Sequence, residues 1–226
     1  MISIFSLISR LIDMVKYLFI LLFSFSAFLL NAQVINPKHT FNIELGLPNG
    51  FVNKPFKNIM QGLVNVAPYY QYKLNKQFVV GLGVRYAYFA INEFKVPKPT
   101  YGGMHSGGIF VKAGWERFHT EHFATEIGLK FGYTQNYFVT DRNDSLGLNP
   151  VQVNSTYLEP SFGLILTADE RSSYRLVVSY AFQGFGFRPD LIGLETFGGY
   201  NPADFNKVTS FLIVGFGYTY YFKSKN

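Results

Sequence analysis

Residues 123–136 read FATEIGLKFGYTQN, and their pattern is the clearest indication of the fold in the sequence. Large apolar side chains recur at every second position, at Phe123, Ile127, Leu129, Phe131 and Tyr133. The positions between them hold alanine, glutamate, glycine, lysine, glycine and threonine. Because successive side chains of a strand point to opposite faces, the stretch predicts a β-strand with one apolar face and one face of charges and glycines. Segments of about ten residues with this alternation are typical of strands that cross a membrane.

The same alternation recurs along the chain, and eight segments carry it. They are residues 39–47, 63–72, 78–90, 108–116, 123–136, 157–167, 174–185 and 208–222. The connections alternate between short turns, at 73–77, 117–122 and 168–173, and longer loops, at 48–57, 92–106, 140–155 and 186–207. Short turns on one side and long loops on the other are typical of bacterial outer-membrane barrels. We therefore predict an all-β fold, an eight-stranded antiparallel transmembrane up-and-down β-barrel, formed by residues 33–226.

Charged residues inside these segments all fall on the face opposite the apolar row. They are Glu44, Arg85, Lys112, Glu126, Lys130, Glu159 and Arg175. The interior of an eight-stranded barrel is just wide enough to be filled by side chains, so glycines beside long charged residues suit its interior, and the apolar row would face lipid. We expect a charge network inside the barrel, with Trp115 opposite Phe123 and Lys112 therefore directly across from Glu126. In the same way, Lys130 is expected level with Glu159, and Arg85 at a similar height.

Composition excludes several classes of protein. The chain has 226 residues, of which 48% are hydrophobic, 19% aromatic and only 15% charged, with no cysteine. Such aromatic content excludes a disordered chain, and the lack of cysteine excludes thiol catalysis and cysteine-bound metals. The net charge of +6 is dispersed, without the clustered basic and aromatic residues of a nucleic-acid surface. A secreted lipocalin-like barrel, with its apolar face inside, is the alternative fold.

Residues 1–32 predict a cleavable signal peptide. Lys16 precedes an apolar run that closes with small and polar residues, so cleavage is expected between Ala32 and Gln33. A second methionine, Met14, leaves the start of translation open. The alternative is a permanent membrane helix, for which the apolar run is short.

The C-terminal segment resembles those of small outer-membrane barrels of the OmpA transmembrane-domain, OmpX and OmpW type. Gly217, Tyr220 and Phe222 match the positions where that family's assembly signal has a glycine, an aromatic or apolar residue and a final aromatic. The end of the signal peptide, at Ala32, is similar to those of exported Bacteroidetes barrels. The resemblance implies an outer-membrane location and recognition of the last strand by the barrel assembly machinery. Here four residues follow Phe222, and Gly215 stands where the motif has a polar residue.

Catalytic and metal-binding patterns are weak. His105 adjoins Ser106 without a carboxylate at a spacing that would orient the imidazole, so the pair is interpreted as ordinary loop residues. Two further groups are interpreted as solvated loop residues, because their spacing does not fit zinc or calcium: His119, Glu121 and His122, and Asp141, Asn143 and Asp144.

These observations predict a non-enzymatic, monomeric protein of the outer membrane without cofactor, metal or nucleic-acid partner. Its expected partners are outer-membrane lipid and lipopolysaccharide, and its role structural, adhesive or surface-binding through the long loops. The segment 185–207 is the most apolar of these loops, which favours a binding surface there. The alternatives are a narrow channel for small or hydrophobic solutes and a lipid A-modifying enzyme.

Overall fold

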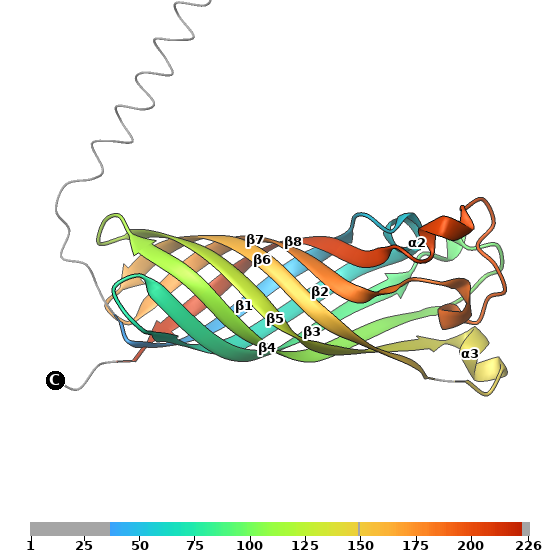
Figure 1. Cartoon of the computed structure of the whole chain (residues 1–226), viewed down its shortest axis with the longest axis horizontal. Helices are drawn as coiled ribbons and strands as arrows, with labels where there is room; N and C mark the ends of the chain where they lie inside the picture. The colour runs from blue at the N-terminus through green and yellow to red at the C-terminus, as the bar shows by residue number, and fades with distance from the viewer. Residues whose placement is uncertain (1–36, 149, 223–226) are drawn as a thin grey trace, which may run out of the picture.

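A computed structural model describes residues 37–148 and 150–222. Eight antiparallel strands form a closed barrel in sequence order, as predicted (Figure 1). Closure follows from the pairing of β1 with both β2 and β8, from Thr40 opposite Tyr221 to Gly50 opposite Phe211 in the second case. Each backbone donor and acceptor of the wall can therefore pair within the sheet, and no strand edge is left open. The predicted signal peptide and its cleavage site at Ala32 and Gln33 lie outside the described residues.

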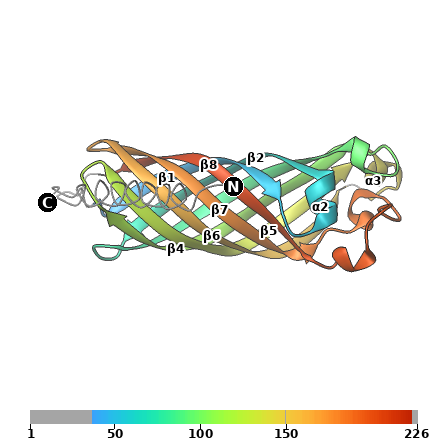
Figure 2. The same cartoon turned by 90° about the horizontal axis from the view of Figure 1, so that it is seen from above.

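Every predicted segment corresponds to one strand of the barrel. The strands are β1 (His39–Gly50), β2 (Met60–Lys73), β3 (Phe78–Ile91), β4 (Gly102–Phe118), β5 (Phe123–Thr140), β6 (Val151–Asp169), β7 (Ser172–Gly186) and β8 (Val208–Tyr221). Three short turns join strands at one end of the barrel, called here the turn end. The longer connections lie at the opposite, loop end, with α2 (Lys54–Ile59) and α3 (Asp141–Ser145) (Figures 1 and 2). Three 3-10 helices, η1 (Glu93–Lys95), η2 (Pro189–Ile192) and η3 (Pro202–Asp204), are also in these loops.

The two faces of the wall are those that the alternation predicts. On β5, Ile127, Leu129 and Phe131 point outward and are exposed, whereas Glu126 and Lys130 are buried inside. Exposed apolar side chains continue around the barrel in the remaining strands. A lipocalin-like arrangement would place these residues inside, so the alternative fold is wrong. The exterior band is suited to the hydrocarbon of a membrane.

Most strands extend further toward the loop end than predicted, and β4, β5 and β6 do so by the most residues. β4 begins at Gly102 and β6 at Val151, so two segments assigned to loops are paired strand instead. Residues Gly102–Gly107 pair with Gln135–Thr140, and residues Val151–Thr156 pair with Tyr133–Phe138. The exterior residues there are largely polar, so the contrast between the two faces that identified the other strands is absent.

Among the described residues, no helix is long and apolar enough to cross a membrane.

Candidate functional site

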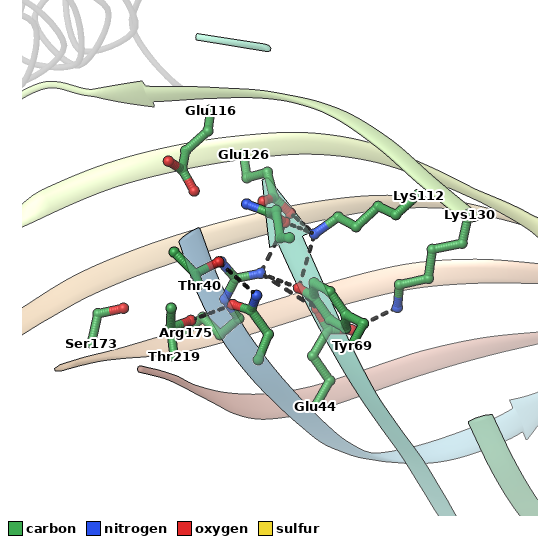
Figure 3. Close-up of polar contacts among 12 residues, drawn as sticks. Thr40, Glu44, Tyr69, Lys112, Glu116, Glu126, Lys130, Ser173, Arg175 and Thr219 are labelled. Carbon is green, nitrogen blue, oxygen red and sulfur yellow. Dashed lines mark hydrogen bonds and ion pairs between the residues drawn. The ribbon is translucent and has the colours of Figure 1, made fainter. Parts of the chain in front are cut away.

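Seven residues form a hydrogen-bonded group across the middle of the barrel interior, called here the central network. They are Glu44, Tyr69, Lys112, Glu126, Lys130, Glu159 and Arg175, and Figure 3 labels all of them except Glu159. Lys130 Nζ lies 2.6 Å from Glu44 Oε2 and 2.8 Å from Glu159 Oε1. Lys112 Nζ lies 2.6 Å from Glu126 Oε1. Burying isolated charges costs several kcal/mol each, about as much as such close pairing can return, so the network depends on all its members being present.

Tyr69 joins the ion pairs to one another, and it is not among the residues that the sequence predicts for the interior network. Its hydroxyl donates to Glu44 Oε1 at 2.7 Å and accepts from Lys112 Nζ at 2.9 Å and Arg175 Nη1 at 2.5 Å. Arg175 reaches this hydroxyl from β7 and Lys112 from β4, so the tyrosine connects opposite walls (Figure 3). The alternating pattern could have predicted that Tyr69 points inward, because this residue lies two positions from Gln71 and four from Asn65 on the inward face of β2.

Glycines make room for these large side chains. A Cβ atom at Gly83 would lie 2.4 Å from Tyr69 Cβ and 2.8 Å from Phe110 Cζ. A Cβ atom at Gly217 would lie 2.5 Å from Arg175 Cγ. All three distances are too short for carbon atoms, so the inward glycines are a steric requirement of a filled interior.

The predicted register of β4 and β5 is wrong, although the Lys112–Glu126 ion pair exists. Trp115 pairs with Ile127 rather than Phe123, and Lys112 lies directly across from Lys130. Lys112 reaches Glu126 diagonally, which a long flexible side chain allows. Lys130 does pair with Glu159, as expected.

Arg85 is inside the barrel but apart from the central network, contrary to the expected common height. It pairs with Gly108, four residues from Lys112 along β4 toward the loop end. Its Nη2 donates to Asn65 Oδ1 at 2.9 Å, and its guanidinium carbon lies 4.1 Å from the centre of the Tyr157 ring. The cation is therefore held by an aromatic face and an amide.

Another buried ion pair, separate from the central network, lies toward the turn end. The sequence pattern did not predict this pair. Lys73 Nζ is 2.9 Å from Glu116 Oε1, and both side chains are buried. Lys73 is expected in a turn from the sequence, but in the structure this residue continues the inward face of β2 after Asn65, Tyr69 and Gln71. Charged residues therefore fill the interior at more than one level.

At the loop end the interior is closed by six phenylalanines, called here the aromatic cap. They are Phe56, Phe89, Phe138, Phe187, Phe197 and Phe211, and each is at most 1% exposed. The ring of Phe187 lies 5.6 Å from Phe56, 6.0 Å from Phe138 and 5.3 Å from Phe197, centre to centre. Phe187 and Phe197 belong to the last loop, which folds over the barrel mouth. Buried aromatic residues of this kind contribute several kcal/mol each to stability.

This arrangement corrects the interpretation of segment 185–207 as an apolar binding surface. Phe185, Phe187, Leu191 and Phe197 are buried in the barrel mouth rather than presented to solvent. Their apolar composition reflects packing inside the protein. Composition alone does not tell whether an apolar loop packs inside the barrel or presents an apolar surface to solvent.

Side-chain hydrogen bonds tie the loops together above the cap. Asn143 Nδ2 donates to the Leu191 carbonyl at 2.9 Å, and Asn53 Nδ2 donates to the Lys207 carbonyl at 2.9 Å. The Tyr101 hydroxyl bonds to the Glu93 carboxylate, which raises the pKa of Tyr101. A cleft of about 410 Å³ remains between three loops. Its lining includes Pro97, Lys98, Arg142, Leu146, Leu148, Asp190, Leu194, Glu195 and Thr196.

The histidine and acidic groups do not assemble into catalytic or metal sites. His105 and Ser106 lie in β4, not in a loop, and point to opposite faces: His105 contacts Tyr86 outside, and Ser106 accepts from Gln183 inside. Neighbouring strand residues cannot act on one substrate from opposite faces. His119 bonds Thr125, and no group of three or more metal-ligating side chains is found in the described parts of the chain.

The proposed assembly signal lies at the end of β8 and beyond it. Gly217 faces inward beside Arg175, and Tyr220 and Phe222 are exposed on the outside. The aromatic pair packs at 5.2 Å between ring centres. Tyr220 and Phe222 are therefore accessible from the lipid side of the barrel, whereas Gly217 is not.

Comparisons with known proteins concern the fold. No family model matches the sequence, and no curated protein matches it. The structure is similar to that of Neisserial surface protein A (NspA), with a TM-score of 0.55 and 11% identity, covering 82% of this chain and 97% of that one. The chain folds as a small eight-stranded outer-membrane β-barrel.

Two further solved structures give lower scores for this barrel. OprG from Pseudomonas aeruginosa has a TM-score of 0.47 and 13% identity, covering 85% of this chain and all of that one. Ail of Yersinia pestis, in complex with the heparin analogue sucrose octasulfate, has a TM-score of 0.45 and 14% identity, covering 80% of this chain and 97% of that one.

The exterior apolar band and the closed sheet accord with a location in the outer membrane.

Proposed function

We propose that this barrel is a non-conducting, non-enzymatic protein that binds partners at the cell surface through its folded loops. One observation supports the proposal most directly. Two separate groups of side chains, the central network and the aromatic cap, fill the interior at different levels. A solute crossing the barrel would have to separate buried ion pairs and then displace six buried rings. Both steps are costly, which argues against the narrow-channel alternative.

The loops have the properties of a preformed binding surface. They are held to the barrel by the cap and to one another by Asn53 and Asn143. A preformed surface loses little conformational entropy on binding. The cleft between the loops is lined by apolar side chains together with two basic and two acidic ones, and its volume of about 410 Å³ falls within the usual range of ligand sites.

Electrical recording tests the closed interior. Refolded full-length protein in a planar bilayer should show no steady conductance at moderate voltage. A reproducible open level would contradict the proposal and favour the channel. Lipid A extracted from cells that express the protein should keep its mass, and a mass shift would favour the enzyme.

The binding role is tested at the cleft. Outer-membrane vesicles that carry the protein should bind members of an array of purified glycans and matrix proteins. Thr196→Trp would fill the cleft from an exposed position and should lower that signal without changing conductance. Equal binding by the variant, or no binding by either protein, would contradict a role for the loops.

We also propose that the barrel assembly machinery recognises the last strand through Tyr220 and Phe222. Phe222→Ala should lower the amount of folded barrel in the outer membrane, measured by heat-modified migration on gels. Phe216→Ala, also exposed on β8, serves as the control. Equal losses for both variants would argue against a specific end signal.

A further inference from the structure

On the side formed by β3, β4, β5 and β6, the outward residues change from apolar to polar toward the loop end. β4, β5 and β6 contain 17, 18 and 19 residues, whereas about 9 to 11 residues suffice to cross the hydrocarbon of a membrane. On β6 the outward residues from Leu166 to Leu158 are mostly apolar, and those beyond them, Thr156 and Asn154, are polar. One side of the barrel therefore continues past the apolar band toward the loop end, where β5 leads into α3 (Figure 1).

Six outward side chains lie on neighbouring strands there and are called here the polar wall. They are Tyr86, His105, Gln135, Tyr137, Gln152 and Asn154. The register aligns them in two rows: Gln135 pairs with Asn154, and Tyr137 pairs with both His105 and Gln152. None of the six carries a permanent charge. An interfacial aromatic girdle explains tyrosines at this height, but it does not explain the three amides beside them.

The side chains of the polar wall are held in place by one another. Tyr86 Oη and His105 Nδ1 are 2.8 Å apart, Tyr137 Oη donates to Gln135 Oε1 at 3.0 Å, and Gln152 Nε2 donates to Asn154 Oδ1 at 2.9 Å. Each amide keeps further donor or acceptor capacity for another molecule. Fixed amides next to tyrosine rings provide directional hydrogen bonds together with flat apolar contact, at low entropic cost.

A notch interrupts the wall at Gly107. This residue pairs with Tyr86 on one side and Gln135 on the other, and a Cβ atom placed on it would meet no atom within 4 Å. The notch thus gives a ligand access to the polar groups that surround it. It also allows a substitution that fills the space without a clash inside the protein.

We propose that the polar wall binds the sugar headgroup of a glycolipid in the outer leaflet. The wall faces sideways and begins where the apolar band ends, so a neighbouring lipid with acyl chains against Phe131 and Leu158 would place its headgroup against Gln135 and Asn154. Sugars present hydroxyl groups in fixed directions and apolar ring faces, which match amides and tyrosines. An uncharged wall has no means of selecting phosphates, which charged side chains bind best.

The proposal predicts preference for lipid-linked sugars in a direct binding experiment. Full-length protein in phosphatidylcholine nanodiscs is titrated with rough-type lipopolysaccharide that carries core sugars, with lipid A, and with phosphatidylglycerol, and complexes are counted by native mass spectrometry. The lipopolysaccharide should be retained most strongly. Lipid A, whose headgroup is a phosphorylated disaccharide, should be retained less than lipopolysaccharide and more than phosphatidylglycerol. Equal retention of phosphatidylglycerol, or binding of the free core oligosaccharide with the same affinity, would overturn the proposal.

Matched variants locate the site. Gly107→Trp, and separately the double change Gln135→Leu with Asn154→Leu, should each weaken lipopolysaccharide binding about tenfold, as expected for the loss of one or two hydrogen bonds. Gln61→Leu, at an exposed amide of β2 outside the wall, should bind as the wild type does. Thermal unfolding of all variants verifies that they fold. Unchanged binding by both wall variants, or a dimer that buries the wall, would contradict the proposal, whereas the closed-pore test above is unaffected by either result.

Discussion

At the scale of single residues, the interior of the barrel depends on groups that serve several partners at once. Tyr69 is the clearest case, because one hydroxyl contacts a carboxylate, an ammonium and a guanidinium group. Removal of one hydroxyl therefore changes the environment of three buried charges. The inward glycines Gly83 and Gly217 are equally specific, since each leaves the space that a larger side chain occupies.

Tyr69→Phe should lower the free energy of unfolding by about 1 to 3 kcal/mol, because buried charged groups lose a hydrogen-bond partner. Urea titration of the barrel refolded into liposomes measures the change. Tyr70→Phe is the matched control, since Tyr70 is the next residue on the same strand and is exposed on the outer face. A comparable loss in the control variant would show that the position of the hydroxyl is irrelevant.

Glu126→Gln should cost about 3 kcal/mol or more, because it leaves Lys112 buried without its ion-pair partner. It should also raise any residual conductance. Adding Lys112→Met removes the unpaired charge, so the double variant should recover part of the stability. The same urea titration measures the free energy of unfolding of both variants. A double variant no more stable than Glu126→Gln would refute the energetic coupling between Lys112 and Glu126.

At the scale of the strand, each β-segment has one face for lipid and one for the packed interior, and the same substitution has different consequences on each. Leu129 is 45% exposed on β5, whereas Thr134 on the same strand is fully buried and lies 2.9 Å from Ser155 Oγ. A large side chain at Thr134 would be forced into a filled interior. The polar exterior position Gln135 is therefore the informative comparison.

Leu129→Arg should destabilise the barrel by about 2 to 4 kcal/mol, the cost of arginine facing lipid near the midplane. Gln135→Arg, beyond the apolar band, should cost less than about 1 kcal/mol, as expected near the interface. Folding titrations in liposomes compare the two. Equal costs would mean that the exterior has no apolar band bounded at this height.

At the scale of the whole molecule, the turn end and the loop end have different organisation. Short turns close one end, and the other carries two helices, a loop cap and the extended wall of β4, β5 and β6 (Figure 2). Long loops face outward from the cell in bacterial outer-membrane barrels. The orientation can be measured directly, because the sequence has no cysteine to interfere.

Ser145→Cys, at the exposed end of α3, should react with a membrane-impermeant maleimide on intact cells. Lys76→Cys, in the exposed turn between β2 and β3, should react only after the outer membrane is permeabilised. Lys73, although adjacent in sequence, is buried inside the barrel and would not report on orientation. The reverse labelling pattern would invert the topology.

Alternation along the sequence by itself determined the strand count, the two faces of each strand and the placement of seven charged residues inside. It could do so because the direction of a side chain in a strand depends only on its position along that strand. The tertiary structure decided what alternation does not encode. The register that brings Lys112 diagonally to Glu126 depends on the turn that joins β4 and β5. The lengths of β4 and β6 were hidden, because outward residues such as Gln152 and Asn154 lie beyond the apolar band and are polar, which removes the apolar signal. The aromatic cap was hidden as well, since Phe187 and Phe197 become interior residues only when the last loop folds over the closed barrel.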